Sequence, residues 1–234
     1  THSIRHIVAH RVTEPADKAQ YSVMASTLPV AHVEQLANCV VEANFTPVTL
    51  VPRGVAVLNM ATQAEGVLKE DKAQGFLQID AGTSTLLLFV GTRLVLARKF
   101  RKGTGTIVES IMSVYDLDRE TAEKLFSSGS IDFSELPSDA VRSWMHQVGI
   151  SLDFIERRHD VRVEVVNLAG CGTDVNVLTN LVSEGVQRDI VAWEPLASLG
   201  APEPPSGAGR HLNRYAVAVG EAMRVMERRN SHAV

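Results

Sequence analysis

Residues 75–100 constrain the fold of this chain more than any other segment. An apolar run ends at Asp80, a turn of small residues follows at 81–84, and two further apolar runs are joined by a second turn at Gly91-Thr92. Apolar runs separated by such short turns are typical of antiparallel strands joined as hairpins. We therefore expect residues 75–100 to form a three-stranded antiparallel meander with an acidic residue at its first bend.

The first turn of this meander has the composition of a phosphate-binding loop. Gly82 lets the backbone approach a ligand closely, while Thr83 and Ser84 add hydroxyl donors to the backbone N–H groups. Asp80 is placed to hold a metal ion or one of its waters beside a phosphate. An ordinary hairpin turn explains the same residues equally well, because Asp and Gly are common in turns. The residues alone leave both interpretations open.

The composition is that of a folded protein that does not bind nucleic acid. The chain has 234 residues, of which 45% are hydrophobic, so it can form one large domain or two small ones. The net charge of −4 comes from 23 basic and 27 acidic residues spread along the sequence. This leaves no basic stripe of the kind that a phosphate backbone attracts.

Cysteine usage and hydropathy indicate a soluble cytoplasmic protein. Cys39 and Cys171 lie in no CxxC or Cys/His cluster, so neither a zinc site nor a disulfide scaffold is expected. No apolar run approaches the roughly 20 residues that cross a bilayer, and no signal peptide opens the chain. We therefore expect no direct membrane insertion, although a partner can recruit the protein to a membrane.

Apolar periodicity predicts strands and helices on both sides of the meander. Before it we expect strands at 5–12 and 20–28, a helix at 33–41, a short strand at 46–51 and a helix at 55–68. After it we expect helices that follow 103–105 and Asp118, a long helix from 138, a strand at 161–168, a helix at 175–182, a strand at 190–193, a loop at 195–209 and a last helix at 211–228.

From residue 75 onward the predicted order is three strands, helices, strand, helix, strand and helix. This order resembles the repeating unit of the α/β actin-like ATPase fold, a ribonuclease H-like fold in which two such units face each other across a nucleotide cleft. Residues 1–74 resemble only the rear part of a second unit, without its own meander and phosphate turn. We therefore expect a partial first lobe at 1–74 and a complete second lobe at 75–230.

Within that superfamily the sequence resembles the PilM proteins, which are cytoplasmic actin-like proteins of type IV pilus assembly. Short motifs recur in the family's order over about residues 20–228, at Asp80–Ser84, Leu96–Phe100, Gly103–Gly105, Ala122-Glu123, Leu168–Gly172, Glu194-Pro195 and Ala216–Ala222. The chain departs from the family where Phe126 replaces a Lys and where Thr104 and Cys171 replace Gly. Both glycine replacements add bulk where a ligand would approach the backbone. The family's first phosphate turn has no counterpart in these residues.

The resemblance implies a set of residues that face ATP or ADP. Those implied at the phosphates are Asp80, Gly82, Thr83 and Ser84, with Mg²⁺ at Asp80, and Gly103 and Gly105 would form a second wall beneath them. Gly170 and Gly172 would lie at the same cleft, and Glu123 on its adenosine side. Each has a competing explanation: a helix-entry turn for the 103–105 glycines, tight packing for the 170–172 glycines, and a plain surface charge for Glu123.

The resemblance also implies a function in protein assembly. We expect a PilM-like component of a type IV pilus or related envelope platform, tuned by nucleotide and docked on the tail of a PilN-like, membrane-anchored partner at the inner membrane. An exposed sheet edge would favour a homo-oligomer. No catalytic residue is assigned, and we expect little ATP turnover because one turn cannot clamp phosphates from two sides. The alternatives are a small-molecule kinase of the sugar-kinase type, for which no catalytic base is evident, and a degenerate scaffold that binds no nucleotide.

Overall fold

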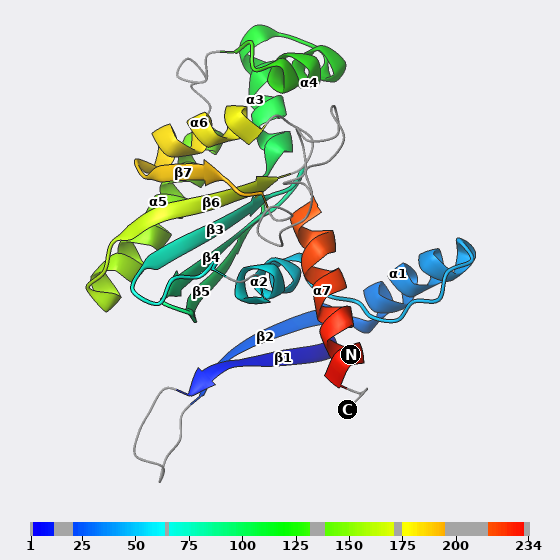
Figure 1. Cartoon of the computed structure of the whole chain (residues 1–234). Coiled ribbons are helices and arrows are strands. Elements are labelled where there is room, and N and C mark those ends of the chain that lie inside the picture. Colours follow the sequence, from blue (N-terminus) through cyan, green and yellow to red (C-terminus); the bar gives the residue numbers. More distant parts are fainter. Residues whose placement is uncertain are drawn as a thin grey trace. The chain divides into compact units, whose positions relative to one another are not determined.

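The computed structural model describes residues 2–11, 21–63, 66–131, 139–170, 175–194 and 215–231. Two compact units are present, Thr1–Pro52 and Arg53–Val234. Figure 1 shows the ribbon with its elements labelled along the sequence. None of the helices in these ranges is both long and apolar enough to cross a membrane.

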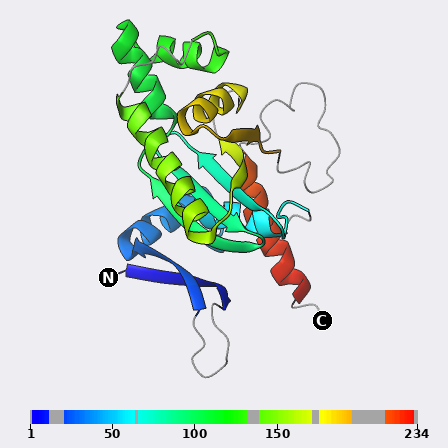
Figure 2. The ribbon, with the colours of Figure 1, turned by 90° about the vertical axis from the view of Figure 1, so that its left-hand side faces the viewer.

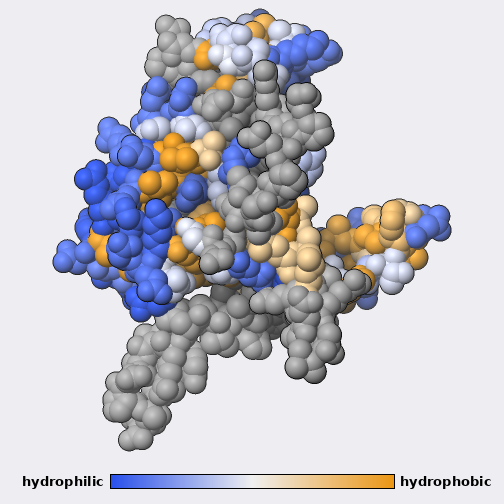
Figure 3. All heavy atoms as spheres, in the orientation of Figure 1, coloured by the Kyte–Doolittle hydropathy of each residue, from blue (hydrophilic) through white to orange (hydrophobic). Residues whose placement is uncertain are grey.

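The first unit is a hairpin followed by a helix. Strand β1 (His2–Arg11) pairs antiparallel with β2 (Tyr21–Pro29), and α1 (Val30–Glu42) follows directly. Apolar side chains are exposed on the surface of α1, as Figure 3 shows, including Leu36 and Val41. The predicted strand at 46–51 is wrong: residues 45–50 have no regular structure, because no strand within the described ranges pairs with them and Pro47 has no N–H to donate.

The second unit is built on a sheet with the strand order β5-β4-β3-β6-β7. The predicted meander is confirmed as β3 (Ala73–Ile79), β4 (Ser84–Val90) and β5 (Arg93–Phe100), paired antiparallel. Strands β6 (Val163–Gly170) and β7 (Asp189–Ala192) continue the sheet in parallel with β3. Its helices are α2 (Arg53–Gln63), α3 (Thr104–Tyr115), α4 (Arg119–Ser128), α5 (Asp139–His159), α6 (Val175–Val186) and α7 (Ala216–Ser231).

Local sequence signals account for most of these elements. Asp118 caps α4 as predicted, because its carboxylate accepts a hydrogen bond from Thr121 N. Helix α5 runs through Gly149 without a break. The predicted loop at 195–209 and the predicted start of the last helix at 211 lie outside the described residues.

Alternation along the strands gives the sheet two apolar faces. Leu77 and Ile79 of β3 lie in a core that also contains side chains of α3, α5 and α6, and Figure 2 shows α5 crossing this face. Phe76 lies on the opposite face, where its ring meets Trp193 edge to face with the centroids 4.8 Å apart. Helix α2 covers this second face, where Gly54 lies against Thr85 of β4.

Helices α2 and α7 pack against each other almost backbone to backbone. A side-chain carbon placed on Gly220 of α7 would lie 1.9 Å from the carbonyl oxygen of Ala56 in α2. Ala216, one turn earlier on the same side of α7, is fully buried. The small residues of the Ala216–Ala222 motif therefore serve this close helix crossing.

Candidate functional site

The carboxyl ends of β3 and β6 bring the predicted glycine turns together. Ile79, the last residue of β3, pairs with Gly170, the last residue of β6. The turn that begins at Asp80 therefore starts beside the end of β6. The carboxyl ends of adjacent parallel strands form the edge at which α/β sheets bind ligands, and we call this edge, made of residues 80–83, 103–105 and 170, the β3–β6 corner.

The turn is docked on the amino terminus of α3. Asp80 N donates to Thr83 O over 2.8 Å and closes the turn. The carbonyl oxygens of Asp80 and Ala81 then accept from Thr104 N at 2.9 Å and Gly105 N at 2.8 Å. The first N–H groups of α3 are thereby satisfied by the turn itself.

This docking explains the glycines at 103 and 105 without a ligand. A side-chain carbon on Gly103 would lie 2.0 Å from Asp80 O, and one on Gly105 would lie 2.9 Å from Ala81 O. Both are closer than non-bonded atoms approach, so the backbone of the turn fills the space that a side chain would need. Thr104, which lies between the two glycines, is itself buried.

The outer side of the turn is open. Ala81 and Gly82 are exposed, and a side-chain carbon on Gly82 would meet nothing within 4 Å. Within the described part of the chain, no hydrogen bond uses the N–H groups of Ala81, Gly82 or Thr83. Successive open N–H groups of this kind suit an anion such as a phosphate.

Ser84 lies on the core side of the sheet. Its side chain is fully buried and its hydroxyl accepts a hydrogen bond of 3.1 Å from Trp144 Nε1 on α5. The alternation of side chains along β4 also predicts this burial, because Ser84 lies on the same face as the core residues Leu86 and Leu88. The Ser84 hydroxyl is thus engaged beneath the corner, whereas Thr83 is only half-buried.

The carboxylate of Asp80 is held by two residues that the sequence analysis did not single out. Nη1 of Arg53, the first residue of α2, lies 2.6 Å from Asp80 Oδ1, and Gln78 Nε2 donates to the same oxygen over 3.2 Å. Alternation along β3 places Gln78 and Asp80 on one side of the strand, which is a signal that could have found Gln78. No local pattern links Arg53 to Asp80, which follows 27 residues later in the sequence.

This donor set does not fit a resident Mg²⁺ ion. Among the described residues, no three His, Cys, Asp or Glu side chains lie close enough together to hold a metal. Mg²⁺ at a phosphate site is usually held by one or two carboxylates and waters, and Oδ1 of the single carboxylate here already accepts from a guanidinium and an amide. We therefore derive no step through a metal at this corner.

The other predicted site residues lie apart or are used in packing. A side-chain carbon on Gly170 would lie 3.1 Å from Ile79 O and 3.3 Å from Leu178 Cδ1, so tight packing explains this glycine. Glu123 is exposed on α4 and pairs with Arg119 at 3.5 Å, and no contact in the described ranges joins it to the turn. Phe126 is buried in the core. Gly172, with its neighbour Cys171, lies outside the described residues.

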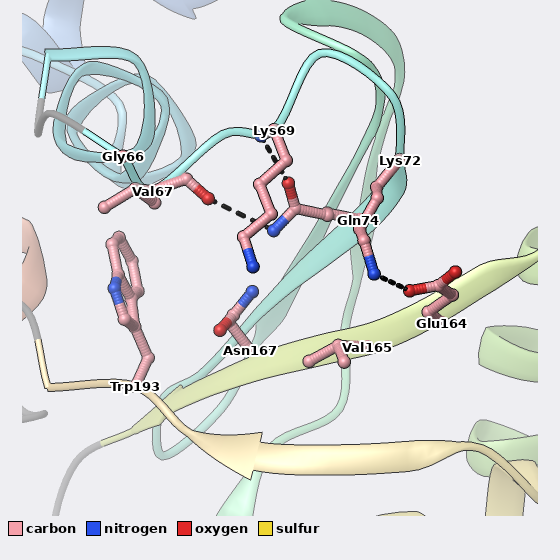
Figure 4. Close-up of a pocket in the computed structure, with 9 residues that line it drawn as sticks. All are labelled: Gly66, Val67, Lys69, Lys72, Gln74, Glu164, Val165, Asn167 and Trp193. Carbon is pink, nitrogen blue, oxygen red and sulfur yellow. Dashed lines mark hydrogen bonds and ion pairs between the residues drawn. The ribbon is translucent and has the colours of Figure 1, made fainter.

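A separate pocket lies at the other end of β3 (Figure 4). Its volume is about 310 Å³, and its lining residues are Gly66, Val67, Lys69, Lys72, Gln74, Glu164, Val165, Asn167 and Trp193. Gln74 bridges Lys69 N and Val67 O, and Lys72 forms an ion pair with Glu164. Because β3 rises about 3.3 Å per residue, Gln74 in this pocket lies roughly 20 Å along the strand from Asp80.

Comparison with solved structures identifies the fold. The chain aligns with a chain of the PilM–PilN type IV pilus biogenesis complex at a TM-score of 0.78 and 21% identity, covering 95% of this chain and 66% of the other. The fold is actin-like.

Two further actin-like proteins agree with this assignment. MreB 5 of Spiroplasma citri, bound to AMPPNP, aligns at a TM-score of 0.52 and 10% identity over 88% of this chain and 68% of its own. Ta0583, an archaeal actin homolog in complex with ADP, aligns at a TM-score of 0.51 and 14% identity. The alignment covers 79% of this chain and 59% of Ta0583. No family model and no curated protein sequence matches the chain.

The comparisons confirm the predicted actin-like α/β fold and its likeness to PilM at the level of the fold. At 66% coverage, the chain spans slightly less than two thirds of the aligned chain of the PilM–PilN complex. In the actin-like fold of this chain, the β3–β6 corner contains Asp80, Gly82, Thr83, Gly103, Gly105 and Gly170.

Proposed function

We propose that this protein is a PilM-like, actin-fold component of the cytoplasmic platform of a type IV pilus or a related envelope machine. Its work would be protein–protein assembly, and a membrane-anchored partner with a PilN-like cytoplasmic tail would hold it at the inner membrane. The observation that supports this best is the alignment of 95% of the chain with a chain of the PilM–PilN complex.

We further propose that ATP or ADP binds at the β3–β6 corner and tunes this assembly. Two of the compared actin-like proteins carry ADP or AMPPNP. In this chain the open N–H groups of Ala81, Gly82 and Thr83 suit the phosphates. We also propose a complete second lobe at residues 75–230 and part of a first lobe at 1–74. Phosphoryl transfer needs positioning and charge neutralisation from several sides of the phosphates. At the turn of residues 80–83 alone we therefore expect weak nucleotide binding and negligible ATP hydrolysis.

The partner proposal is tested by cell fractionation. In cells that carry the pilus machinery, the protein should sediment with the inner membrane. It should move to the soluble fraction when the PilN-type partner lacks its cytoplasmic tail, because the tail is the proposed anchor. A partner with a scrambled periplasmic segment but an intact tail serves as the control. An unchanged distribution after removal of the tail would contradict the proposal.

A degenerate scaffold that binds no nucleotide is the second candidate. Phe126 favours this candidate, because it stands where PilM proteins have a Lys and is buried in the core. Arg53 favours it as well, because it forms an ion pair with the Asp80 carboxylate. A ligand that binds only the folded state raises the melting temperature. The absence of a shift with saturating ADP, with and without Mg²⁺, would favour the scaffold.

A further inference from the structure

We infer that Arg53 takes the place of a divalent cation at the β3–β6 corner, so that the corner binds the phosphate groups of a nucleotide without a metal ion, an inference that rests on the proposed nucleotide binding. The side chains that carry it are Arg53, Gln78 and Asp80, with the open N–H groups of residues 81–83.

The contact between Arg53 and Asp80 occupies Oδ1, one of the two carboxylate oxygens that a cation could use. Arg53 Nη1 lies 2.6 Å from Asp80 Oδ1, which is a short charge-assisted hydrogen bond. A Mg²⁺ ion bound to the same oxygen would sit about 2.0–2.1 Å from it and would face the guanidinium charge at close range. The positive charge of Arg53 therefore disfavours a metal ion at Oδ1, the carboxylate oxygen that it contacts.

Burial distinguishes the roles of the two partners. The Asp80 side chain is 10% exposed, whereas the Arg53 side chain is 61% exposed. The guanidinium therefore covers the carboxylate from the solvent side and keeps its remaining N–H groups in water. Arginine stays protonated at all physiological pH values and presents five N–H donors in a planar fork that matches phosphate oxygens.

Gln78 holds the carboxylate from within the core. The residue is 2% exposed, and its amide nitrogen donates to the oxygen that also contacts Arg53. Within the described residues its Oε1 has no hydrogen-bond partner, so the amide is anchored only through Asp80. We assign Gln78 as a positioning residue that keeps Asp80 Oδ1 turned toward Arg53.

The charge of Arg53 neutralises that of Asp80, so the corner no longer repels an anion. A lone Asp80 carboxylate beside the N–H groups of Ala81 to Thr83 would repel phosphate and would require an added cation. Arg53 cancels that charge within the chain, and the N–H groups of the turn remain to bind phosphate oxygens. Removal of Arg53 should therefore create a requirement for a divalent cation that the native chain lacks.

Calorimetric titration of the whole chain with ADP, in EDTA and in Mg²⁺, tests this inference. The native chain should bind ADP with dissociation constants that agree within about twofold in the two buffers. Arg53→Ala should bind ADP about tenfold or more weakly in EDTA and regain affinity in Mg²⁺. Arg142→Ala removes an exposed arginine from α5, on the other face of the sheet, and should behave as the native chain does.

The outcomes separate this inference from the proposed function. Native binding that needs Mg²⁺ would overturn the role of Arg53 and leave nucleotide binding intact. Equal ADP affinity of Arg53→Ala and the native chain in EDTA would overturn it as well. The absence of ADP binding in both buffers would overturn the inference together with the nucleotide-binding proposal. The comparison of buffers with the native chain needs no variant, so a misfolded variant does not weaken the test.

Discussion

Gly220→Ala is expected to lower the free energy of unfolding by about 2–3 kcal/mol, at the upper end for overpacked sites. The new side-chain carbon would lie 1.9 Å from Ala56 O, a backbone atom that cannot rotate away. Helices α2 and α7 would have to separate, and the apolar face of the sheet beneath α2 would lose part of its cover. Urea denaturation followed by circular dichroism measures the change.

Gly149→Ala is the matched control for this change. Gly149 also lies inside a helix, α5, but a side-chain carbon there would meet nothing within 4 Å. Replacing a helix-interior glycine by alanine without a clash stabilises by about 0.5–1 kcal/mol, through backbone entropy. The two substitutions should therefore change stability in opposite directions. A Gly220→Ala variant that is as stable as Gly149→Ala would refute the close α2–α7 contact.

Gly103→Ala is expected to weaken ADP binding by about tenfold or more and to destabilise the fold by about 1–3 kcal/mol. The added carbon would lie 2.0 Å from Asp80 O and 2.7 Å from Ala81 O, so the turn would be pushed off α3. The hydrogen bonds from Thr104 N and Gly105 N to the turn would then be lost. ADP titration and urea denaturation of the same preparation measure both effects.

Gly82→Ala separates the two effects. Its added carbon meets nothing within 4 Å, so stability should stay within about 0.5 kcal/mol of the native value. The methyl group would nevertheless stand on the open side of the turn, where a phosphate would approach, and should weaken ADP binding. Equal loss of stability in Gly82→Ala and Gly103→Ala would contradict the described docking of the turn on α3.

Patterns that are local in the sequence predicted most of the fold. The meander at 75–100, the Asp118 cap and the amphipathic α5 each follow from spacing within one segment, and the structure confirms them. The predicted strand at 46–51 failed because an apolar run becomes a strand only when a neighbour pairs with it, and pairing is a tertiary property.

The candidate site was only partly predictable for the same reason. The resemblance indicated the positions of Gly103 and Gly105, but their reason, the approach of the Asp80 and Ala81 carbonyls, needs coordinates. The alternation of side chains along β4 placed Ser84 on the same face as the core residues of that strand. The sequence contained this signal, but we interpreted Ser84 as part of the hydroxyl-rich turn. The pairing of Arg53 with Asp80 joins α2 to the meander and has no local signature.

An amide NMR titration of the isotopically labelled chain with ADP tests the central claim most directly, because it locates the phosphate-binding edge residue by residue. The largest shifts should fall on the N–H groups of Ala81, Gly82 and Thr83 and on Gly170, which lies beside them at the β3–β6 corner. The residues of the opposite pocket, such as Lys69 and Asn167, should show little change. Shifts confined to that pocket, or no shifts at saturating ADP, would contradict the account.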